Sequence, residues 1–334
     1  MRFKIYIALL VCTLYSVLCT PLQAKKPVEP DRQADTLTVE QQQQFTYYWY
    51  AAKQAIEQER YPDALALLEF CRMIKPNDGQ TLTYLGIIYS STGKKELALQ
   101  TFKQAFEADP RDQWFKYAYT LIEQHTLASV KEAQSVMERA LEAQKDKVDE
   151  DLLEQLRRLY LSTAQCAKAI EMQDRIDAIR GYDAYSAVNR YRTYALWNKP
   201  KKAMEAVDKY LELEPMNVQF MLFRLEIMEH MGVKQSELYA MYERVLNLDP
   251  GNLMVLNNYA YHLATHKGDL KKAERMSAIT IHEQPQNPVY LDTYGWILHL
   301  QGQDELALFF LQRALSNTTE EAKPEIEKHI NAIK

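Results

Sequence analysis

The chain has 334 residues, of which 47% are hydrophobic, and it carries 40 Lys and Arg residues against 45 Asp and Glu residues. This hydrophobic content is sufficient for a buried core and excludes a chain that is disordered throughout. With only 9 Gly and 12 Pro, the composition favours helices over a turn-rich all-β fold, so we expect an all-α protein. The formal net charge of −5 makes nucleic acid a poor partner.

Residues 1–24 have the three-part layout of a secretory signal peptide. Arg2 and Lys4 precede an apolar stretch at residues 5–19, and cleavage fits best after Ala24. The stretch is shorter than the about 20 residues that span a bilayer, which disfavours an uncleaved anchor. We therefore expect an exported chain, periplasmic or secreted.

Cleavage would change the cysteine content and the charge of the chain. The two remaining cysteines, Cys71 and Cys166, lie far apart, which disfavours a disulfide framework. Leu18 directly precedes Cys19, where a lipid anchor would require a small residue. The mature chain would hold 38 basic and 45 acidic residues, a net charge of about −7. No later segment is apolar enough to span a membrane.

Residues 25–44 are predicted to be a flexible tether. They contain Pro27, Pro30 and a run of four glutamines at 41–44. The first helix is expected to begin near Thr38, which is a suitable N-cap residue.

A repeat of about 35 residues follows. A small residue with a core residue four positions later recurs at intervals of 34 to 36 residues. Its members are Ala64, Ala98, Ala133, Ala169, Ala203, Leu238, Ala273 and Ala307. Prolines with the same period are Pro76, Pro110, Pro215, Pro250 and Pro285. Two ladders with one period predict an array of similar units.

Residues 79–112 show what one unit contains. Gly86 lies within an apolar helical pattern and would let a neighbouring helix approach closely. Gly93 would end that first helix in a left-handed turn. A second helix with small residues at Ala98 and Ala105 would then cross the first, and Pro110 would stop it. The unit is a helix-turn-helix hairpin.

The order of these residues resembles the consensus of the tetratricopeptide repeat (TPR) family, and 79–112 matches it almost completely. Further good matches are 45–78, 184–217, 253–287 and 288–321. Degenerate units, supported mainly by spacing, are 113–149, 150–183 and 218–252. Gln173 replaces an aromatic residue, and Arg190 and Arg224 lie where an apolar residue is usual. The resemblance implies a right-handed superhelical solenoid of about eight repeats at 45–321, with a C-terminal capping helix at 322–334.

In TPR proteins the second, fifth, ninth and twelfth positions of each repeat line an inner groove that binds other polypeptides. The resemblance places at such positions Trp49, Lys53, Trp114, Tyr117, Arg158, Tyr185, Arg192, Asn257, Tyr261, Trp296 and His299. Exposed aromatic residues offer large contact areas, and the charged residues could pair with a peptide. The alternative is that several of these aromatics pack between repeats as core.

Catalytic and metal sites are not indicated. His262 and His266 are four residues apart on a predicted helix, but no third ligand is evident, so we expect a solvated helix end. Cys71 falls at a small core position, which disfavours a nucleophile. The set of Lys, Asn and Arg that some TPR proteins use to bind a partner's C-terminal carboxylate is absent. No length remains for a catalytic domain, and no cofactor is expected.

The sequence therefore predicts a non-enzymatic scaffold in the cell envelope that binds peptide segments or protein partners of unknown identity. The style of the repeats resembles that of bacterial exported proteins. An envelope glycan-capturing protein on a helical-repeat scaffold is the alternative, although the long inserts that build such sugar sites are not evident. The oligomeric state stays open.

Overall fold

A computed structural model describes residues 37–145 and 148–333 of the chain. Within these residues it shows 17 helices and no strand, which confirms the predicted all-α class. The predicted signal peptide and most of the predicted tether lie outside the described residues. The helices are α2 (Val39–Glu57), α3 (Tyr61–Ile74), α4 (Gly79–Ser91), α5 (Lys95–Ala108), α6 (Trp114–Ile122), α7 (Leu127–Gln144), α8 (Glu150–Ser162), α9 (Cys166–Arg180), α10 (Ala184–Leu196), α11 (Pro200–Leu213), α12 (Val218–Met231), α13 (Gln235–Leu248), α14 (Leu253–Thr265), α15 (Leu270–Glu283), α16 (Pro288–Leu300), α17 (Asp304–Asn317) and α18 (Lys323–Ile333).

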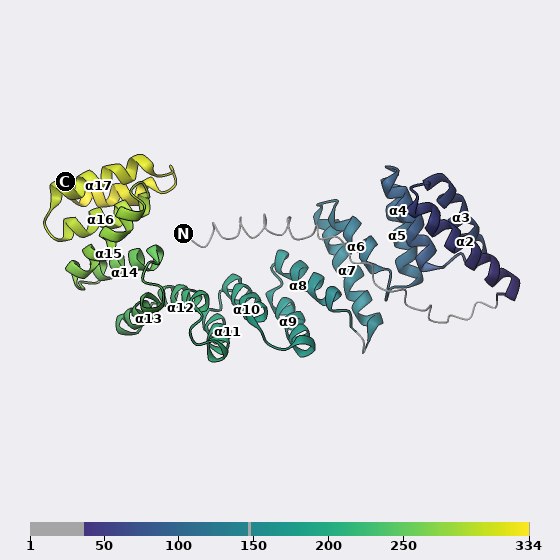
Figure 1. The fold of residues 1–334 in the computed structure, drawn as a ribbon, viewed down its shortest axis with the longest axis horizontal. Helices are drawn as coiled ribbons and strands as arrows, with labels where there is room; N and C mark the ends of the chain where they lie inside the picture. The colour runs from purple at the N-terminus through teal and green to yellow at the C-terminus, as the bar shows by residue number, and fades with distance from the viewer. Residues whose placement is uncertain (1–36, 146–147, 334) are drawn as a thin grey trace. The chain divides into compact units, whose positions relative to one another are not determined.

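The chain divides into two compact units, residues 1–181 and 182–334. In its described part, the first unit holds four helical hairpins, α2/α3 to α8/α9, coloured purple to teal in Figure 1. The second unit holds the hairpins α10/α11 to α16/α17 and then α18, coloured green to yellow. Each unit is therefore a run of helix pairs in chain order.

Four of the seven links between hairpins combine a proline with a capping side chain. All five prolines of the predicted ladder lie just after a second helix. Two residues after Pro76, Asp78 accepts a hydrogen bond from the Thr81 amide at 2.8 Å. Two residues after Pro215, Asn217 accepts one from the Phe220 amide at 3.2 Å. Proline cannot continue the preceding helix and the cap satisfies a free amide of the next, so each of these four links both ends and starts a helix.

The small residues of the predicted ladder lie where the helices pack. All eight members, from Ala64 to Ala307, lie in second helices and are at most 4% exposed. Gly86 in α4 allows the closest approach, because a Cβ atom there would lie 2.5 Å from the Phe102 ring of α5. Gly295 in α16 has the same role, with a Cβ position 2.8 Å from Leu311 Cγ. The predicted ladder and the close approach at Gly86 are confirmed.

Every hairpin turn contains one residue with positive φ. These residues are Glu59, Gly93, His125, Ala164, Asn198, Gly232, Lys267 and Gly302. The predicted turn at Gly93 is confirmed, with φ of +77°. Five of the eight are not glycine, although side chains disfavour this conformation.

The left-handed residue also fixes the register of each hairpin. Seven positions before it stands a buried residue, which we call the crossing residue because the partner helix approaches most closely there at Gly86 and Gly295. By this count the crossing residues are Ala52, Gly86, Ala118, Arg157, Tyr191, Leu225, Ala260 and Gly295, all of them buried. They are small in the hairpins toward both ends and large in α8, α10 and α12.

The two ends of the described chain differ from the predicted boundaries in one respect. The side chain of Thr38 accepts a hydrogen bond from the Gln41 amide and caps α2, which confirms the predicted start of the first helix. Residues 39–44 are therefore helical, and their assignment to a flexible tether was wrong. At the other end, Ile326 and Ile330 of α18 are buried against Leu291 of α16 and Leu311 of α17.

Candidate functional site

Trp49 and Lys53 lie one turn apart on α2, and both are half-buried. The Trp49 ring packs against Tyr84 of α4 in a T-shaped arrangement, with 5.2 Å between ring centroids. Phe45 stacks on Trp49 at 6.3 Å. An aromatic contact therefore joins the first helices of two consecutive hairpins and leaves part of Trp49 accessible.

Trp114 and Tyr117 of α6 are core residues, and their assignment to an exposed face was wrong. They are 4% and 3% exposed. Tyr117 packs on Phe106 of α5 with ring centroids 5.9 Å apart, and its hydroxyl donates a hydrogen bond to Glu132 of α7. Burial raises the pKa of Tyr117, and the bond to Glu132 raises it further.

The error at α6 is one of register. The predicted repeat begins at residue 113, but Ala118 is the crossing residue and His125 the left-handed one, so the register starts two residues earlier. The corresponding fifth and ninth positions are Phe115 and Tyr119, which are half-buried and stacked at 5.9 Å. Neither residue is among the predicted groove residues. The small residue Ala118 was the signal that could have found them.

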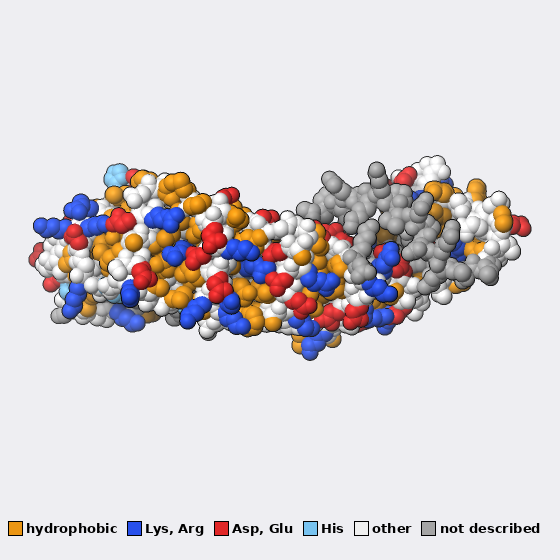
Figure 2. Space-filling model, turned by 90° about the horizontal axis from the view of Figure 1, so that it is seen from below, with side chains coloured by type: hydrophobic (Ala, Val, Ile, Leu, Met, Phe, Trp, Pro, Cys, Tyr) orange, Lys and Arg blue, Asp and Glu red, His pale blue; other side chains and the backbone are white. Residues whose placement is uncertain are grey.

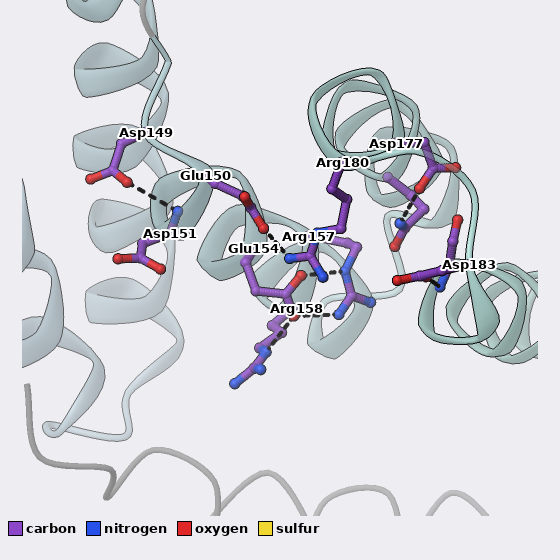
Figure 3. A network of polar contacts seen from close by, with 11 residues as sticks. Asp149, Glu150, Asp151, Glu154, Arg157, Arg158, Asp177, Arg180 and Asp183 are labelled. Carbon is purple, nitrogen blue, oxygen red and sulfur yellow. Dashed lines mark hydrogen bonds and ion pairs between the residues drawn. The ribbon is translucent and has the colours of Figure 1, made fainter.

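Arg158 of α8 is half-buried and belongs to a polar network (Figure 3). Its Nε donates to Glu154 Oε1 at 2.9 Å. The neighbouring Arg157 is 4% exposed and binds Glu154 with two hydrogen bonds, Nε to Oε2 at 3.0 Å and Nη2 to Oε1 at 2.6 Å. Gln173 of α9 is 1% exposed and donates to Asp177 at 2.7 Å. The buried positions that correspond to Gly86 and Phe102 of α4/α5 therefore hold a charged group and an amide group, each hydrogen-bonded to an acidic side chain of its own helix.

In the second unit, Tyr185 and Arg192 of α10 are the most accessible of the predicted groove residues. Tyr185 is 39% exposed and Arg192 is also exposed. They lie at the start of α10 and two turns later. Both can contact a partner without a rearrangement of the hairpin.

The prediction that Asn257 of α14 lines an accessible groove was also wrong. It is 4% exposed, so it does not reach solvent, because the helices packed around α14 cover the fifth position of this repeat. Its Oδ1 atom has no hydrogen-bond partner among the described residues. Tyr261, one turn later, is half-buried.

Trp296 of α16 is held by two histidines. Its ring stacks on His329 of α18 at 4.4 Å between centroids and contacts His299 at 5.1 Å. His329 Nδ1 lies 2.8 Å from Asp292 Oδ1, and His299 Nδ1 lies 2.7 Å from Asp304 Oδ1. Trp296 and His299 nevertheless remain half-exposed. This arrangement fixes a large aromatic surface in one orientation, which suits it to binding.

The groups considered for metal or nucleophilic chemistry are arranged for packing. The rings of His262 and His266 stack at 5.4 Å, and His266 Nδ1 lies 3.0 Å from the His262 carbonyl oxygen. Burial, and then the neighbouring His266, lower the pKa of His262. Across residues 37–145 and 148–333, no three His, Cys, Asp or Glu side chains converge to hold a metal ion. Burial raises the pKa of the Cys71 thiol to about 11, so the thiolate is disfavoured at neutral pH.

In the part of the chain that the structure describes, no helix combines the length and the apolar character needed to cross a bilayer.

Comparison with known proteins identifies the fold family. Residues 80–112 match the family model of the tetratricopeptide repeat. No curated protein matches the chain. Among solved structures, the chain is similar to the C-terminal part of a TPR repeat-containing protein from Cytophaga hutchinsonii, with 18% identity and a TM-score of 0.51 over 74% of this chain and 98% of that one. A tetratricopeptide repeat protein from Parabacteroides merdae is 14% identical, with a TM-score of 0.40 over 87% of this chain and 99% of that one.

The repeat that matches the family model is also the hairpin in which Gly86, Gly93 and Ala98 have the packing and turn roles described above. The same ladder of buried small residues continues through the other described hairpins. One repeat of the chain therefore matches the tetratricopeptide-repeat model, and the chain has an all-α repeat fold similar to that of a tetratricopeptide-repeat protein of known structure.

Proposed function

We propose that the chain is an exported, non-enzymatic scaffold that binds polypeptide partners through the accessible aromatic and charged residues of its first helices. In the first unit these are Trp49, Lys53, Phe115, Tyr119 and Arg158. In the second unit they are Tyr185, Arg192, Tyr261, Trp296 and His299. TPR domains bind protein partners, and the identity of the partner in this case is open.

The packing of Trp296 between two histidines is the main observation that supports the proposal. A half-exposed indole normally samples several orientations in solution. Fixing it in one orientation on binding therefore costs conformational entropy. Here the contacts with His299 and His329 already restrict the ring. A rigid aromatic surface with carboxylates and imidazoles at its edge suits a peptide, because the ring supplies apolar area and the polar groups can pair with backbone amides.

Site-specific photo-crosslinking in the host cell tests the binding surface. A photoreactive amino acid at Tyr185 or Arg192 is expected to form adducts with another polypeptide. The same group at Gln312, which is exposed on the second helix α17, is the matched control and is expected to form none. Absence of polypeptide adducts at both first-helix positions would overturn the proposal. Adducts with glycans alone would favour the glycan-capturing alternative.

Substitution then identifies the residues that hold the partner. Trp296→Ala is expected to weaken capture of the cross-linked partner by at least about tenfold, the usual effect of removing a central aromatic contact. Phe309→Ala is the control, because Phe309 is 52% exposed but lies on α17. Equal capture by the two variants would contradict the role of Trp296.

Export rests on the sequence of residues 1–24 and has its own test. Mass spectrometry of the protein from fractionated host cells is expected to find an N-terminus at Lys25 in the envelope or secreted fraction. An intact N-terminus in the cytoplasm would exclude export without affecting the binding proposal.

A further inference from the structure

Two large apolar side chains are exposed in consecutive hairpin turns of the second unit. Trp197, in the turn between α10 and α11, is 36% exposed, and Met231, in the turn between α12 and α13, is 37% exposed. Each directly precedes the left-handed residue of its turn, Asn198 in the first case and Gly232 in the second. The two side chains therefore occupy equivalent positions of neighbouring repeats.

The fold does not require an apolar residue at this position. In the first unit, the residue directly before the left-handed one is polar and uncharged in every hairpin turn: Gln58, Thr92, Gln124 and Thr163. Turns of the same geometry therefore form without an apolar side chain. The large residues at positions 197 and 231 are available for a role other than folding.

Lysines surround these two side chains. We call residues 197–202, 231–236 and 266–271 the turn surface, because each segment begins at the residue before the left-handed one. It holds a single acidic residue, Asp269, and six exposed lysines: Lys199, Lys201, Lys202, Lys234, Lys267 and Lys271. The corresponding segments of the first unit hold four basic and three acidic residues, at 58–63, 92–97, 124–129 and 163–168. The last turn, between α16 and α17, carries Asp304 and Glu305 and bounds the surface.

The three turns lie along one edge of the second unit because its hairpins stack in register. Tyr191 of α10 stacks on Phe223 of α12, with 4.6 Å between ring centroids, and donates a hydrogen bond to Glu226 at 2.8 Å. Lys272 of α15 pairs with Glu243 of α13. First helices therefore lie beside first helices and second helices beside second helices. Since successive hairpins run in the same direction, their turns fall on the same side.

The excess of positive charge on this edge is local. The whole chain has a formal net charge of −5. Basic and acidic side chains are interspersed over much of the face drawn in Figure 2. Within the turn surface, Lys202 pairs with Glu205 at 2.7 Å, but both side chains are more than half exposed. Such an exposed pair is weak, so Lys202 remains able to bind another anion.

We propose that the turn surface docks on an anionic phospholipid bilayer, with Trp197 and Met231 at the level of the headgroups. Lysine carries a compact charge on a flexible stem, so several lysines along an edge can contact a layer of phosphates without one fixed geometry. Tryptophan is enriched where a bilayer meets water, because its ring is apolar and its N–H group is polar. The turn surface shares no residue with the proposed polypeptide-binding surface.

The chemistry of the turn surface favours a bilayer over other anionic partners. Lys199 Nζ lies 3.2 Å from the centroid of the Trp197 ring, and the Tyr194 ring lies nearly parallel to that ring at 6.4 Å. A nucleobase stacks on an open ring face, and the Lys199 ammonium covers one face of Trp197. Arginine is the residue that binds the carboxylates of an acidic protein in a bidentate way, and the three segments contain none.

Attraction between charges is expected to provide most of the binding. The turn surface has two exposed large apolar side chains against six lysines, so the apolar area that can enter the headgroup layer is small. Electrostatic attraction at an exposed surface is screened by salt. Docking should therefore be reversible and sensitive to ionic strength.

Co-sedimentation of the full chain, as the host cell processes it, with lipid vesicles tests the proposal. Wild type is expected to bind vesicles of equal parts phosphatidylglycerol and phosphatidylcholine, and to bind phosphatidylcholine vesicles far less. It should be released in about 0.5 M salt, where charges are screened beyond a few ångströms.

Two triple variants with the same net charge locate the binding surface. Lys201→Gln, Lys234→Gln and Lys271→Gln together remove one charge from each turn. A lysine near an anionic bilayer contributes about fivefold to binding, so this variant should bind about a hundredfold more weakly. The control removes three exposed lysines from α5, α7 and α18 and should change binding less than about threefold; its substitutions are Lys103→Gln, Lys131→Gln and Lys328→Gln.

Tryptophan fluorescence tests the position of Trp197. Phosphatidylglycerol with brominated acyl chains is expected to quench the fluorescence of the wild type on binding. The quenching should disappear in Trp197→Gln, which keeps the other three tryptophans of the chain. Glutamine occupies the equivalent position at Gln58 and Gln124, so this variant is expected to fold, and melting followed by circular dichroism checks that it does.

Three results would overturn the proposal. Absence of binding to phosphatidylglycerol vesicles would exclude the bilayer, and binding to polyglutamate that depends on the same three lysines would then indicate an acidic polypeptide. Equal weakening by the two triple variants would show that net charge governs binding and the turn surface does not. Quenching that persists in Trp197→Gln would place another surface of the chain at the bilayer.

Discussion

The hairpins α4/α5 and α8/α9 belong to the same unit, yet their helices cross through opposite chemistry. In α4/α5, Gly86 leaves space that the Phe102 ring fills. In α8/α9, the equivalent positions hold Arg157 and Gln173, both buried and hydrogen-bonded to acidic side chains. The repeat therefore fixes the order of the helices, but it does not fix how their crossing is stabilised. An apolar crossing depends on shape and a polar one depends on pairing, so the two should respond to different substitutions.

The largest effect is expected from filling the apolar crossing. Gly86→Val places a branched side chain where a Cβ atom alone would lie 2.5 Å from Phe102, so overpacking should destabilise the chain by about 3 kcal/mol. Gly251→Val is the control, because a Cβ at that exposed position meets no atom within 4 Å. Urea unfolding measures both. Equal unfolding midpoints would show that Phe102 can move and that shape does not hold this crossing.

A smaller effect is expected from breaking the polar crossing. Glu154→Ala removes the carboxylate that accepts two hydrogen bonds from buried Arg157, and it should cost about 2 kcal/mol. Asp63→Ala breaks the pair of Asp63 with Arg60, in which both side chains are more than half exposed, and should cost less than about 0.5 kcal/mol. The double change Arg157→Gly and Gln173→Phe converts the crossing to the apolar kind and should restore stability. A loss no larger than that of Asp63→Ala would refute the role of the buried pair.

Exchanging the turn residues should give two effects of opposite sign. Gly93 and the equivalent Ala164 both have positive φ, +77° and +57°, and both are exposed. Ala164→Gly should stabilise by about 1 kcal/mol, and Gly93→Ala should destabilise by about the same amount. Thermal melting detects both shifts. Changes of the same sign would mean that contacts, and not backbone strain, govern these turns.

The smallest effect concerns the pH dependence of Glu138, a residue of α7 that accepts hydrogen bonds from Tyr160 of α8 and Lys168 of α9. Burial alone would raise the pKa of Glu138, but hydrogen bonds from Tyr160, Lys168 and Gln134 outweigh it and hold the pKa below its usual value. A lowered folded-state pKa contributes stability above the unfolded-state pKa, and this stability is lost as the pH falls through the folded-state value. Glu138→Gln should therefore cost less than about 1 kcal/mol at pH 7, because the carboxylate is a third exposed.

The same variant should match wild type more closely as the pH falls through the lowered folded-state pKa of Glu138, because the wild-type carboxylate then becomes protonated. Urea unfolding at pH 7 and across the acidic range measures the difference. A gap between the two proteins that is independent of pH would show that the Glu138 charge is not involved.

Composition predicted the all-α class, and the spacing of small residues predicted the packing positions. The 34–36-residue period located all eight buried ladder residues, since a stacked array must place the same small side chain at the same crossing. The prolines of the ladder and the Thr38 cap are local features too, and they were also predicted. Arg157 was not predicted to be buried, because a charged residue in a repeat pattern normally faces solvent and only the contact with Glu154 allows otherwise.

The site was harder to predict than the fold. Positions counted from a repeat boundary move with any change in turn length, and α6 starts its register two residues earlier than the boundary at residue 113 implies. Trp114 and Tyr117 were therefore taken as exposed, while Phe115 and Tyr119 were missed. The contact of His329 with Trp296 joins residues 33 positions apart in different helices, so no local sequence pattern predicts it.

The packing of α18 makes the hairpin α16/α17 depend on residues that follow it in the chain. Leu291, Leu311 and Ala314 pack in one cluster with Ile326 and Ile330, which the ribosome adds after them. Until Ile326 and Ile330 emerge, this hairpin exposes an apolar surface that chaperones and proteases can recognise.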